Sequence, residues 1–253
     1  MHAAALAEMG LAGEWTYEAI EVAPEDFDGL VRSLPGQGFA GVNVTVPHKV
    51  AALALADEAS AAAREIGAAN TLAFANGRIQ AENTDATAIA EALPRPPQGM
   101  KALVLGAGGS ARAAIWALRE AGANVHVWNR TYQRAQALAE ELRIGLDTSG
   151  AQILVNATTV GLAEANEIQP LPERGEPDLK PFPVLTDGLS AEVVIDLVYG
   201  SRETDLIAAA RAAGAATVDG LEILARQGAA SLRIWTGVEP PLETMRRAAR
   251  GAS

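Results

Sequence analysis

The stretch KALVLGAGGSARA, residues 101–113, decides the fold of the larger part of this chain. A short apolar run typical of a buried strand leads into Gly106-Ala107-Gly108-Gly109-Ser110-Ala111, a G-x-G-x-x-A fingerprint that opens a helix. Glycines at such a turn let the backbone approach a pyrophosphate, whose charge then lies at the positive helix N-terminus. We therefore predict a dinucleotide site here, with a purely structural glycine turn as the alternative.

The end of the next predicted strand indicates which dinucleotide is bound. NVHVWN ends at Asn129 and is followed by Arg130, Thr131 and Arg134. An acidic residue at this place would hydrogen-bond a ribose 2′-hydroxyl and repel a 2′-phosphate. Two guanidiniums and a hydroxyl near a helix N-terminus instead favour a phosphate. We predict NADP rather than NAD, although Arg134 alone could equally belong to a solvated helix face.

Strands and helices keep alternating downstream of the fingerprint, which is typical of βαβ units and a parallel sheet. Residues 162–190 contain too many prolines for a helix and are expected to form a long connection. Upstream, the proline-rich run 94–99 is the best domain boundary. We predict an α/β fold with two domains. Residues 1–93 and 221–253 form an N-terminal mixed α/β substrate domain, and residues 94–220 form a Rossmann-like doubly wound NADP domain.

The first domain carries its polar groups near predicted strand ends. GVNVTVPHK, residues 41–49, reads as a strand over 41–46 that stops at Pro47 and places Lys49 just beyond it. An Ala-rich helix is expected over 48–65. NTLAFANGRIQAENTD reads as a hairpin around Asn76-Gly77, a type I′ turn signal.

Polar residues gather in three places along these segments. The first holds Asn43, Thr45 and Lys49, the second holds Asn70 and Thr71, and the third holds Asn83, Thr84 and Asp85. A lysine and an aspartate at neighbouring strand ends suit a polyol dehydrogenase that works without a metal, because only a hydroxyl proton must be moved while hydride passes to a nicotinamide. The alternatives are a structural ion pair and an edge strand with a surface lysine.

Composition excludes several classes of function. The chain has 253 residues and no cysteine, so disulfides, thiolate metal sites and a thiol nucleophile are excluded. Its three histidines are too scattered for a metal cluster, and we expect no metal. A net charge of −11 argues against nucleic acid as a partner. We expect no membrane span and no signal peptide, and hence a cytoplasmic protein that is a monomer or a homodimer.

At this point the chain resembles the shikimate dehydrogenases of the shikimate/quinate dehydrogenase family. The motifs that carry the resemblance occur in the family's order over nearly the whole chain: GVNVTVPHK, AANTL, ENTDA, GAGGSARA, NRT..R, NATTVGL, DLVY and DG....L..Q. The resemblance implies an NADP-dependent oxidoreductase that reversibly reduces 3-dehydroshikimate to shikimate in aromatic amino-acid biosynthesis. It also implies that the gap between the two domains closes for hydride transfer.

The resemblance also implies roles for individual residues. Lys49 and Asp85 are implied as the catalytic acid–base pair. Contacts to shikimate are implied for Thr45, Asn70, Asp85, Tyr199 and Gln227. Contacts to NADP are implied for Gly106, Ala107, Gly108, Gly109, Ser110, Ala111, Asn129, Arg130, Thr131, Arg134, Thr158, Thr159, Leu197 and Gly220. Beside Asp85, the Lys49 ammonium is better suited to donate a proton than to accept one at neutral pH, so alcohol oxidation should speed up toward alkaline pH.

The chain also departs from the family's pattern. Members usually begin with a strand and a Ser-x-Ser-Pro segment that holds the substrate carboxylate, just before the Met-His found here at positions 1 and 2. Gly200-Ser201 stands where Asn-Pro is usual, and Ala86 stands where glycine is usual. Three alternatives stay open: an enzyme of mixed quinate and shikimate specificity, since no residue here excludes quinate; a cofactor-binding relative without turnover, since the Ser-x-Ser-Pro segment is not found; and a similar two-domain dehydrogenase of another metabolite such as a folate.

Overall fold

The computed structural model describes residues 1–161, 182, 189–200 and 202–251, so nearly all of the connection expected at 162–190 lies outside the described residues. Two compact units make up the chain: Met1–Ala88 with Leu224–Ala252, and Ile89–Ile223. The division falls inside two helices, α5 (Thr84–Ala92) and α10 (Gly220–Thr236). Each of these helices therefore begins in one unit and ends in the other.

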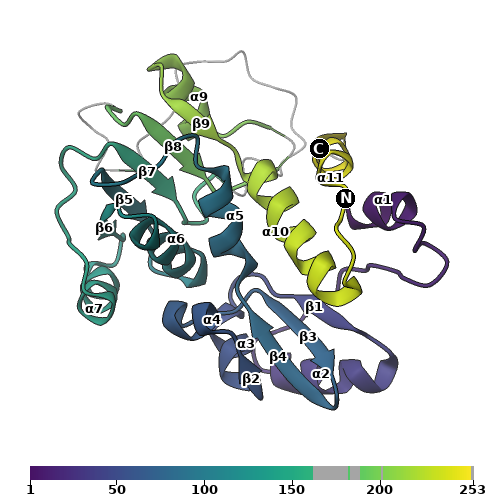
Figure 1. Cartoon of the computed structure of the whole chain (residues 1–253). Helices are drawn as coiled ribbons and strands as arrows, with labels where there is room; N and C mark the ends of the chain where they lie inside the picture. The colour runs from purple at the N-terminus through teal and green to yellow at the C-terminus, as the bar shows by residue number, and fades with distance from the viewer. Residues whose placement is uncertain (162–181, 183–188, 201, 252–253) are drawn as a thin grey trace. The chain divides into compact units, whose positions relative to one another are not determined.

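The second unit contains a five-stranded, fully parallel sheet, which confirms the predicted Rossmann-like fold (Figure 1). Its order is β6-β5-β7-β8-β9, and the strand bounds are Asn124–Trp128, Lys101–Leu105, Ile153–Asn156, Val193–Asp196 and Ala216–Val218. The helices that follow β5, β6 and β8 are α6 (Gly109–Glu120), α7 (Tyr132–Leu142) and α9 (Asp205–Ala212). Strand order reverses between β5 and β7, the place where such sheets bind ligands beyond the strands' carboxyl ends.

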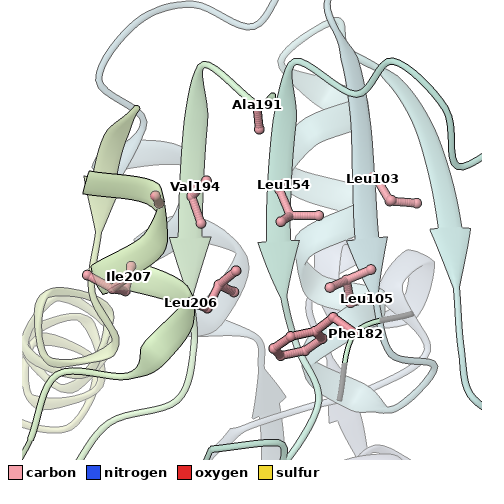
Figure 2. Close-up of a cluster of buried hydrophobic side chains, with 9 residues drawn as sticks. Leu103, Leu105, Leu154, Phe182, Ala191, Val194, Leu206 and Ile207 are labelled. Carbon is pink, nitrogen blue, oxygen red and sulfur yellow. The ribbon is translucent and has the colours of Figure 1, made fainter. Parts of the chain in front are cut away.

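The core of this unit lies between the sheet and its helices. Figure 2 shows leucines of β5 and β7 and Val194 of β8 on the sheet, with Leu206 and Ile207 on α9 nearby. Burying each of these large side chains contributes about 1.5–3 kcal/mol. The central strands are mostly apolar, apart from residues at their ends such as Asn156 and Asp196, because both sheet faces are covered, and this makes them recognisable from sequence. Their rigid packing fixes the loops at the sheet's carboxyl edge.

The first unit is built on a smaller, mixed sheet of order β1-β3-β4-β2. Its strands are β1 (Gly41–Asn43), β3 (Thr71–Ala75), β4 (Arg78–Glu82) and β2 (Glu58–Ala59), with only the β2–β4 pair parallel. The predicted hairpin is confirmed, since Asn76 and Gly77 join β3 to β4 with φ of 54° and 71°. Positive φ at both turn residues is what a type I′ turn requires.

Two expectations for this unit are corrected. The strand expected over 41–46 ends at Asn43, because the chain turns where the His48 amide donates to the Thr45 carbonyl at 2.9 Å. The single helix expected over 48–65 is two helices, α3 (Lys49–Leu55) and α4 (Ala61–Ile66), with β2 between them. Ser60 starts α4 anew by capping it, since its hydroxyl accepts from the Ala63 amide at 3.1 Å.

The remaining helices cover the first unit. They are α1 (His2–Glu8), α2 (Phe27–Ser33), the 3₁₀ turn η1 (Leu34–Gln37) and α11 (Leu242–Gly251), with the second half of α10. Leu6 of α1, Leu232 of α10 and Met245 of α11 share one buried cluster. Residues 15–22 form neither helix nor strand. Among the described helices, none combines the length and apolarity that a membrane crossing needs.

Candidate functional site

A lysine and an aspartate form a nearly buried ion pair in the first unit. The Lys49 Nζ lies 2.6 Å from Asp85 Oδ2, and the two side chains are 12% and 10% exposed. Asp85 lies in the first turn of α5, where the helix dipole favours a carboxylate. Lys49 is the first residue of α3, where the dipole disfavours a cation. The carboxylate of Asp85 therefore offsets the unfavourable position of the Lys49 ammonium at the start of α3. The structure brings together the two residues that were proposed as a pair from sequence.

Asn70 holds the other oxygen of that carboxylate. Its Nδ2 donates to Asp85 Oδ1 at 2.9 Å and to Thr84 Oγ1 at 3.0 Å, and it lies 3.3 Å from Gln227 Oε1. Its Oδ1 accepts from the Thr84 backbone amide at 2.7 Å, which fixes which end of the amide faces Asp85. Asn70 is 2% exposed. Four residues chosen from sequence, Lys49, Asp85, Asn70 and Gln227, thus form one connected cluster.

Three hydroxyls extend this cluster: Thr71 and Thr84 belong to the polar groups noted from sequence, whereas Ser231 was not singled out. Ser231 of α10 contacts Thr71 and Thr84, and Asn43 Nδ2 donates to Ser231 Oγ at 2.7 Å. The available signal was the spacing: Ser231 follows Gln227 by four positions and so shares its helix face. Thr45 is different, because it is exposed and is placed in the turn after β1.

In the second unit, the glycine fingerprint forms the turn that a dinucleotide needs. Gly106 has a φ of 115°, and a Cβ built on it would lie 2.8 Å from the Ala157 carbonyl oxygen. Only glycine fits there, since both the backbone conformation and the space exclude a side chain. Gly108 precedes the first residue of α6 in an extended conformation, and Ala111 is fully buried. The turn between β5 and α6 therefore suits a pyrophosphate.

The residues predicted to select NADP lie at the start of α7. Asn129 Nδ2 donates to the Thr131 carbonyl at 3.0 Å, and the Arg134 amide donates to the same oxygen at 3.0 Å. Thr131 is the N-cap of α7. Arg130, Thr131 and Arg134 are all exposed. Two exposed guanidiniums beside a helix N-terminus, at the carboxyl end of the strand after the fingerprint, are suited to a 2′-phosphate.

Two loops at the sheet edge carry further predicted cofactor residues, and a buried carboxylate connects them. Asp196 Oδ1 accepts from Asn156 Nδ2 at 2.8 Å and from the Val198 amide at 3.1 Å, and Oδ2 accepts from Thr204 Oγ1 at 2.5 Å. Asn156 Oδ1 in turn accepts from Thr158 Oγ1 at 2.7 Å. Burial raises the pKa of Asp196 to about 6, although its hydrogen bonds oppose this.

Asp196 was not singled out from sequence, yet it orders two loops that bear predicted residues. Thr158 and Thr159 follow β7, and Leu197 and Tyr199 follow β8. Gly220 packs against that second loop, because a Cβ built on it would lie 2.3 Å from the Val198 carbonyl oxygen. Tyr199 belongs to this unit and is 41% exposed. Within the described ranges, no group of three or more histidines and acids could hold a metal ion.

Family models match the chain in three places. Residues 1–72 match the shikimate dehydrogenase substrate-binding domain, residues 88–157 match shikimate/quinate 5-dehydrogenase, and residues 220–250 match the shikimate 5′-dehydrogenase C-terminal domain. These ranges include the Lys49 and Asn70 segments, the glycine fingerprint and Gln227.

Curated relatives and solved structures agree with these matches. An NADP(+) shikimate dehydrogenase of Thermus thermophilus is 43% identical over 258 residues, covering 100% of this chain and 92% of that protein. The one from Methanopyrus kandleri is 40% identical over 270 residues, covering 98% and 88%. A crystal structure of a Thermus thermophilus shikimate 5-dehydrogenase with NADP(H) and shikimate aligns with a TM-score of 0.84 at 41% identity, covering 100% of this chain and 93% of that one. This chain belongs to the shikimate dehydrogenase family.

Proposed function

We propose that this protein is an NADP-dependent shikimate dehydrogenase, which interconverts 3-dehydroshikimate with NADPH and shikimate with NADP in aromatic amino-acid biosynthesis. The observation that carries the proposal is the Lys49–Asp85 pair at 2.6 Å, joined through Asn70 to Gln227 in a nearly buried polar cluster. A full-length match to NADP(+) shikimate dehydrogenases supports it independently.

The proposed chemistry needs one proton and one hydride. NADPH, when bound, supplies the hydride to the ketone carbon. Lys49 donates a proton from its ammonium to the ketone oxygen, so that an N–H bond breaks and an O–H bond forms. Asp85 holds the Lys49 ammonium in place before transfer. In the reverse direction the neutral amine of Lys49 accepts the hydroxyl proton.

Substrate contacts are proposed for the polar residues around this pair. Asn70 Nδ2 donates to Gln227 Oε1 at 3.3 Å, a long hydrogen bond that a ring hydroxyl can replace at little cost. Thr45 and Tyr199 are exposed and so can contact a ligand. These four residues, with Asp85, make the proposed shikimate set.

The cofactor is proposed to bind the fingerprint turn through its pyrophosphate and the start of α7 through its 2′-phosphate. The observed fit is the cradle at Gly106, where a Cβ would collide with the Ala157 carbonyl. Asn129, Arg130, Thr131 and Arg134 are the proposed 2′-phosphate contacts. Thr158, Thr159, Leu197 and Gly220 are proposed to border the remainder of the cofactor.

Steady-state rates test the proposal directly. Nicotinamide absorbance would be followed with shikimate or quinate as the alcohol and NADP or NAD as the acceptor. We expect the largest kcat/KM for shikimate with NADP. A comparable value with quinate would replace the assignment by an enzyme of mixed specificity, and binding of NADP without turnover of either alcohol would replace it by a non-catalytic relative.

Location and assembly are part of the same proposal. A small acidic protein without cysteine suits the cytoplasm, where the reduced dinucleotide pool is available. We propose a monomer or a homodimer, which light scattering at several protein concentrations distinguishes.

A further inference from the structure

Ser231 is a fully buried hydroxyl on the face of α10 that also carries Gln227. Its Oγ lies 2.9 Å from the backbone carbonyl oxygen of Gln227, 2.7 Å from Asn43 Nδ2 and 2.9 Å from Thr71 Oγ1. A carbonyl only accepts and an amide NH₂ only donates, so Ser231 donates its proton to the backbone carbonyl of Gln227. One lone pair of Ser231 Oγ then accepts a hydrogen bond from the Asn43 NH₂. Two hydroxyls face the remaining lone pair, and Thr71 Oγ1 at 2.9 Å is the closer donor, since Thr84 Oγ1 lies 3.4 Å away.

The donor at Ser231 determines the donor at each neighbouring hydroxyl. Because the Thr71 proton is used on Ser231, the contact of 3.1 Å between Thr71 Oγ1 and Thr84 Oγ1 requires Thr84 to be the donor. The Thr84 oxygen is then an acceptor for Asn70 Nδ2 at 3.0 Å. The hydrogen bonds along this row of hydroxyls therefore run one way, from the Asn70 NH₂ through Thr84, Thr71 and Ser231 to the backbone carbonyl of Gln227, while Asn43 donates to Ser231 and Thr71 from the side.

A competing arrangement is also within reach. Thr71 Oγ1 lies 3.4 Å and Thr84 Oγ1 3.3 Å from Asn70 Oδ1, so either hydroxyl could turn its proton toward that oxygen instead. In that arrangement the hydroxyls no longer order the Asn70 NH₂ that faces Asp85. The Ser231 oxygen prevents this arrangement, because it accepts the Thr71 proton. The Thr71 oxygen is then left to accept the Thr84 proton, so neither proton points to Asn70 Oδ1.

We infer that Ser231 is a positioning residue for the substrate site: it sets the direction of the hydrogen-bond chain and so keeps the Thr84 hydroxyl oxygen available as an acceptor for the Asn70 NH₂, which reinforces the orientation that the Thr84 backbone amide gives to Asn70. The inference rests on the proposed function. Ser231 itself does not contact the acid–base pair, so its loss should disturb ground-state binding by Asn70 and Gln227 more than the chemical step.

The test compares Ser231→Ala with Thr236→Ala. Thr236 is a matched control, since it lies on the same helix and its hydroxyl likewise donates to the carbonyl four residues earlier, that of Leu232, at 2.7 Å. For Ser231→Ala we expect KM for shikimate to rise about tenfold, since a buried donor loses its acceptor, with kcat within about threefold and NADP affinity unchanged. Thr236→Ala should leave all three unchanged.

Thr71→Val is the second variant, which breaks the same chain at its neighbouring link with nearly the same side-chain volume. It should likewise raise KM for shikimate with little change in kcat. The Ser231→Ala/Thr71→Val double variant should have a KM close to that of either single variant. Equal KM values for Ser231→Ala and Thr236→Ala, or additive effects of Ser231→Ala and Thr71→Val, would overturn the inference.

A substrate-free readout separates this inference from the proposed function. The side-chain ¹⁵N resonance of Asn70 should shift or broaden in Ser231→Ala and Thr71→Val and stay unchanged in Thr236→Ala. If the wild-type protein does not oxidise shikimate, the proposed function fails while this comparison still decides whether Ser231 orders Asn70. An unchanged Asn70 resonance in both chain variants contradicts the positioning role whatever the turnover.

Discussion

Two buried aspartates, one in each unit, have similar surroundings but different partners. Asp85 accepts from the Asn70 amide at 2.9 Å, and Asp196 accepts from the Asn156 amide at 2.8 Å. The second oxygen of Asp85 faces the Lys49 ammonium, whereas that of Asp196 faces the Thr204 hydroxyl. The pairing with Lys49 places Asp85 next to a group that can move a proton, whereas the neutral donors around Asp196 come from the loops that it holds in place.

The neutral surroundings have an energetic consequence for Asp196. All the donors to it that the described residues supply are uncharged, and burial raises its pKa from 3.8 to about 6. The difference corresponds to about 3 kcal/mol of penalty on the ionised form in the folded state. The second unit thus keeps a destabilising carboxylate that orders the loops after β7 and β8.

The largest expected effect is on Lys49. Lys49→Ala removes the proton donor, so kcat for shikimate oxidation should fall about 10³-fold, while NADP affinity stays unchanged because the fingerprint turn is untouched. Turnover is measured by nicotinamide absorbance and NADP binding by calorimetry. The matched control is Lys101→Ala, which breaks the Lys101–Asp147 pair of the second unit and should leave kcat unchanged. A similar loss of kcat in both variants would contradict the assignment of proton transfer to Lys49.

Next in size is the effect of Asp196→Asn on stability. An acid whose pKa is raised by folding holds its proton in the native state after the unfolded chain has lost it, so stability falls as pH rises from about 4 to 6. The asparagine has no such penalty, and it can still accept from Asn156 while donating to Thr204. We expect up to about 3 kcal/mol of added stability at pH 7 and none below pH 4.

Urea denaturation of both proteins between pH 3 and pH 8 provides this measurement. Asp147→Asn is the control of opposite sign. Hydrogen bonds from Lys101 and Ser149 lower the pKa of Asp147, so its carboxylate contributes stability that is lost in acid. A pH-independent difference between wild type and Asp196→Asn would contradict the account of Asp196.

A smaller effect is expected for the cofactor's phosphate. Arg130→Ala should weaken NADP by about tenfold or more, since a hydrogen bond between charged groups contributes about 1.5–3 kcal/mol, and it should leave NAD affinity nearly unchanged. Binding of both dinucleotides is compared by calorimetry, with Arg134→Ala as the companion variant. An equal loss for NAD and NADP would mean that these arginines do not face the 2′-phosphate.

The smallest effect is expected for Thr204→Val, which removes one neutral donor from Asp196. The unit should lose about 1 kcal/mol of stability at pH 7, and the pKa of Asp196 should rise further because a hydrogen bond that lowers it is gone. Thr204→Ser keeps the hydroxyl and should behave as wild type in the same denaturation experiment. If Thr204→Val lowered kcat as Lys49→Ala does, Asp196 would belong to the chemistry after all.

Local signals made much of this architecture predictable. Gly106 and the apolar strand before it predict the Rossmann turn, and Asn76-Gly77 predicts the hairpin, because each depends on a few adjacent residues. The break between α3 and α4 was missed, since it depends on Ser60 capping and on β2 pairing with the distant β4.

Local motifs likewise made only part of the site predictable. Lys49, Asn70 and Asp85 stand in recognisable motifs, whereas Ser231 joins Asn43 across 188 positions of the chain. Asp196 reads from sequence as the end of a buried strand, and only the folded sheet places Asn156 beside it. Long-range polar contacts of this kind leave no periodic pattern in a single sequence.

The central claim is that the Lys49 amine moves the proton, and chemical rescue tests it most directly. The rate of shikimate oxidation by Lys49→Ala would be measured against increasing methylamine at several pH values, beside wild type without added amine. We predict a wild-type rate that rises toward alkaline pH, a nearly inactive variant, and a rate restored in proportion to the neutral amine. A variant that oxidises shikimate at the wild-type rate without amine, with a wild-type profile flat in pH, would contradict the claim.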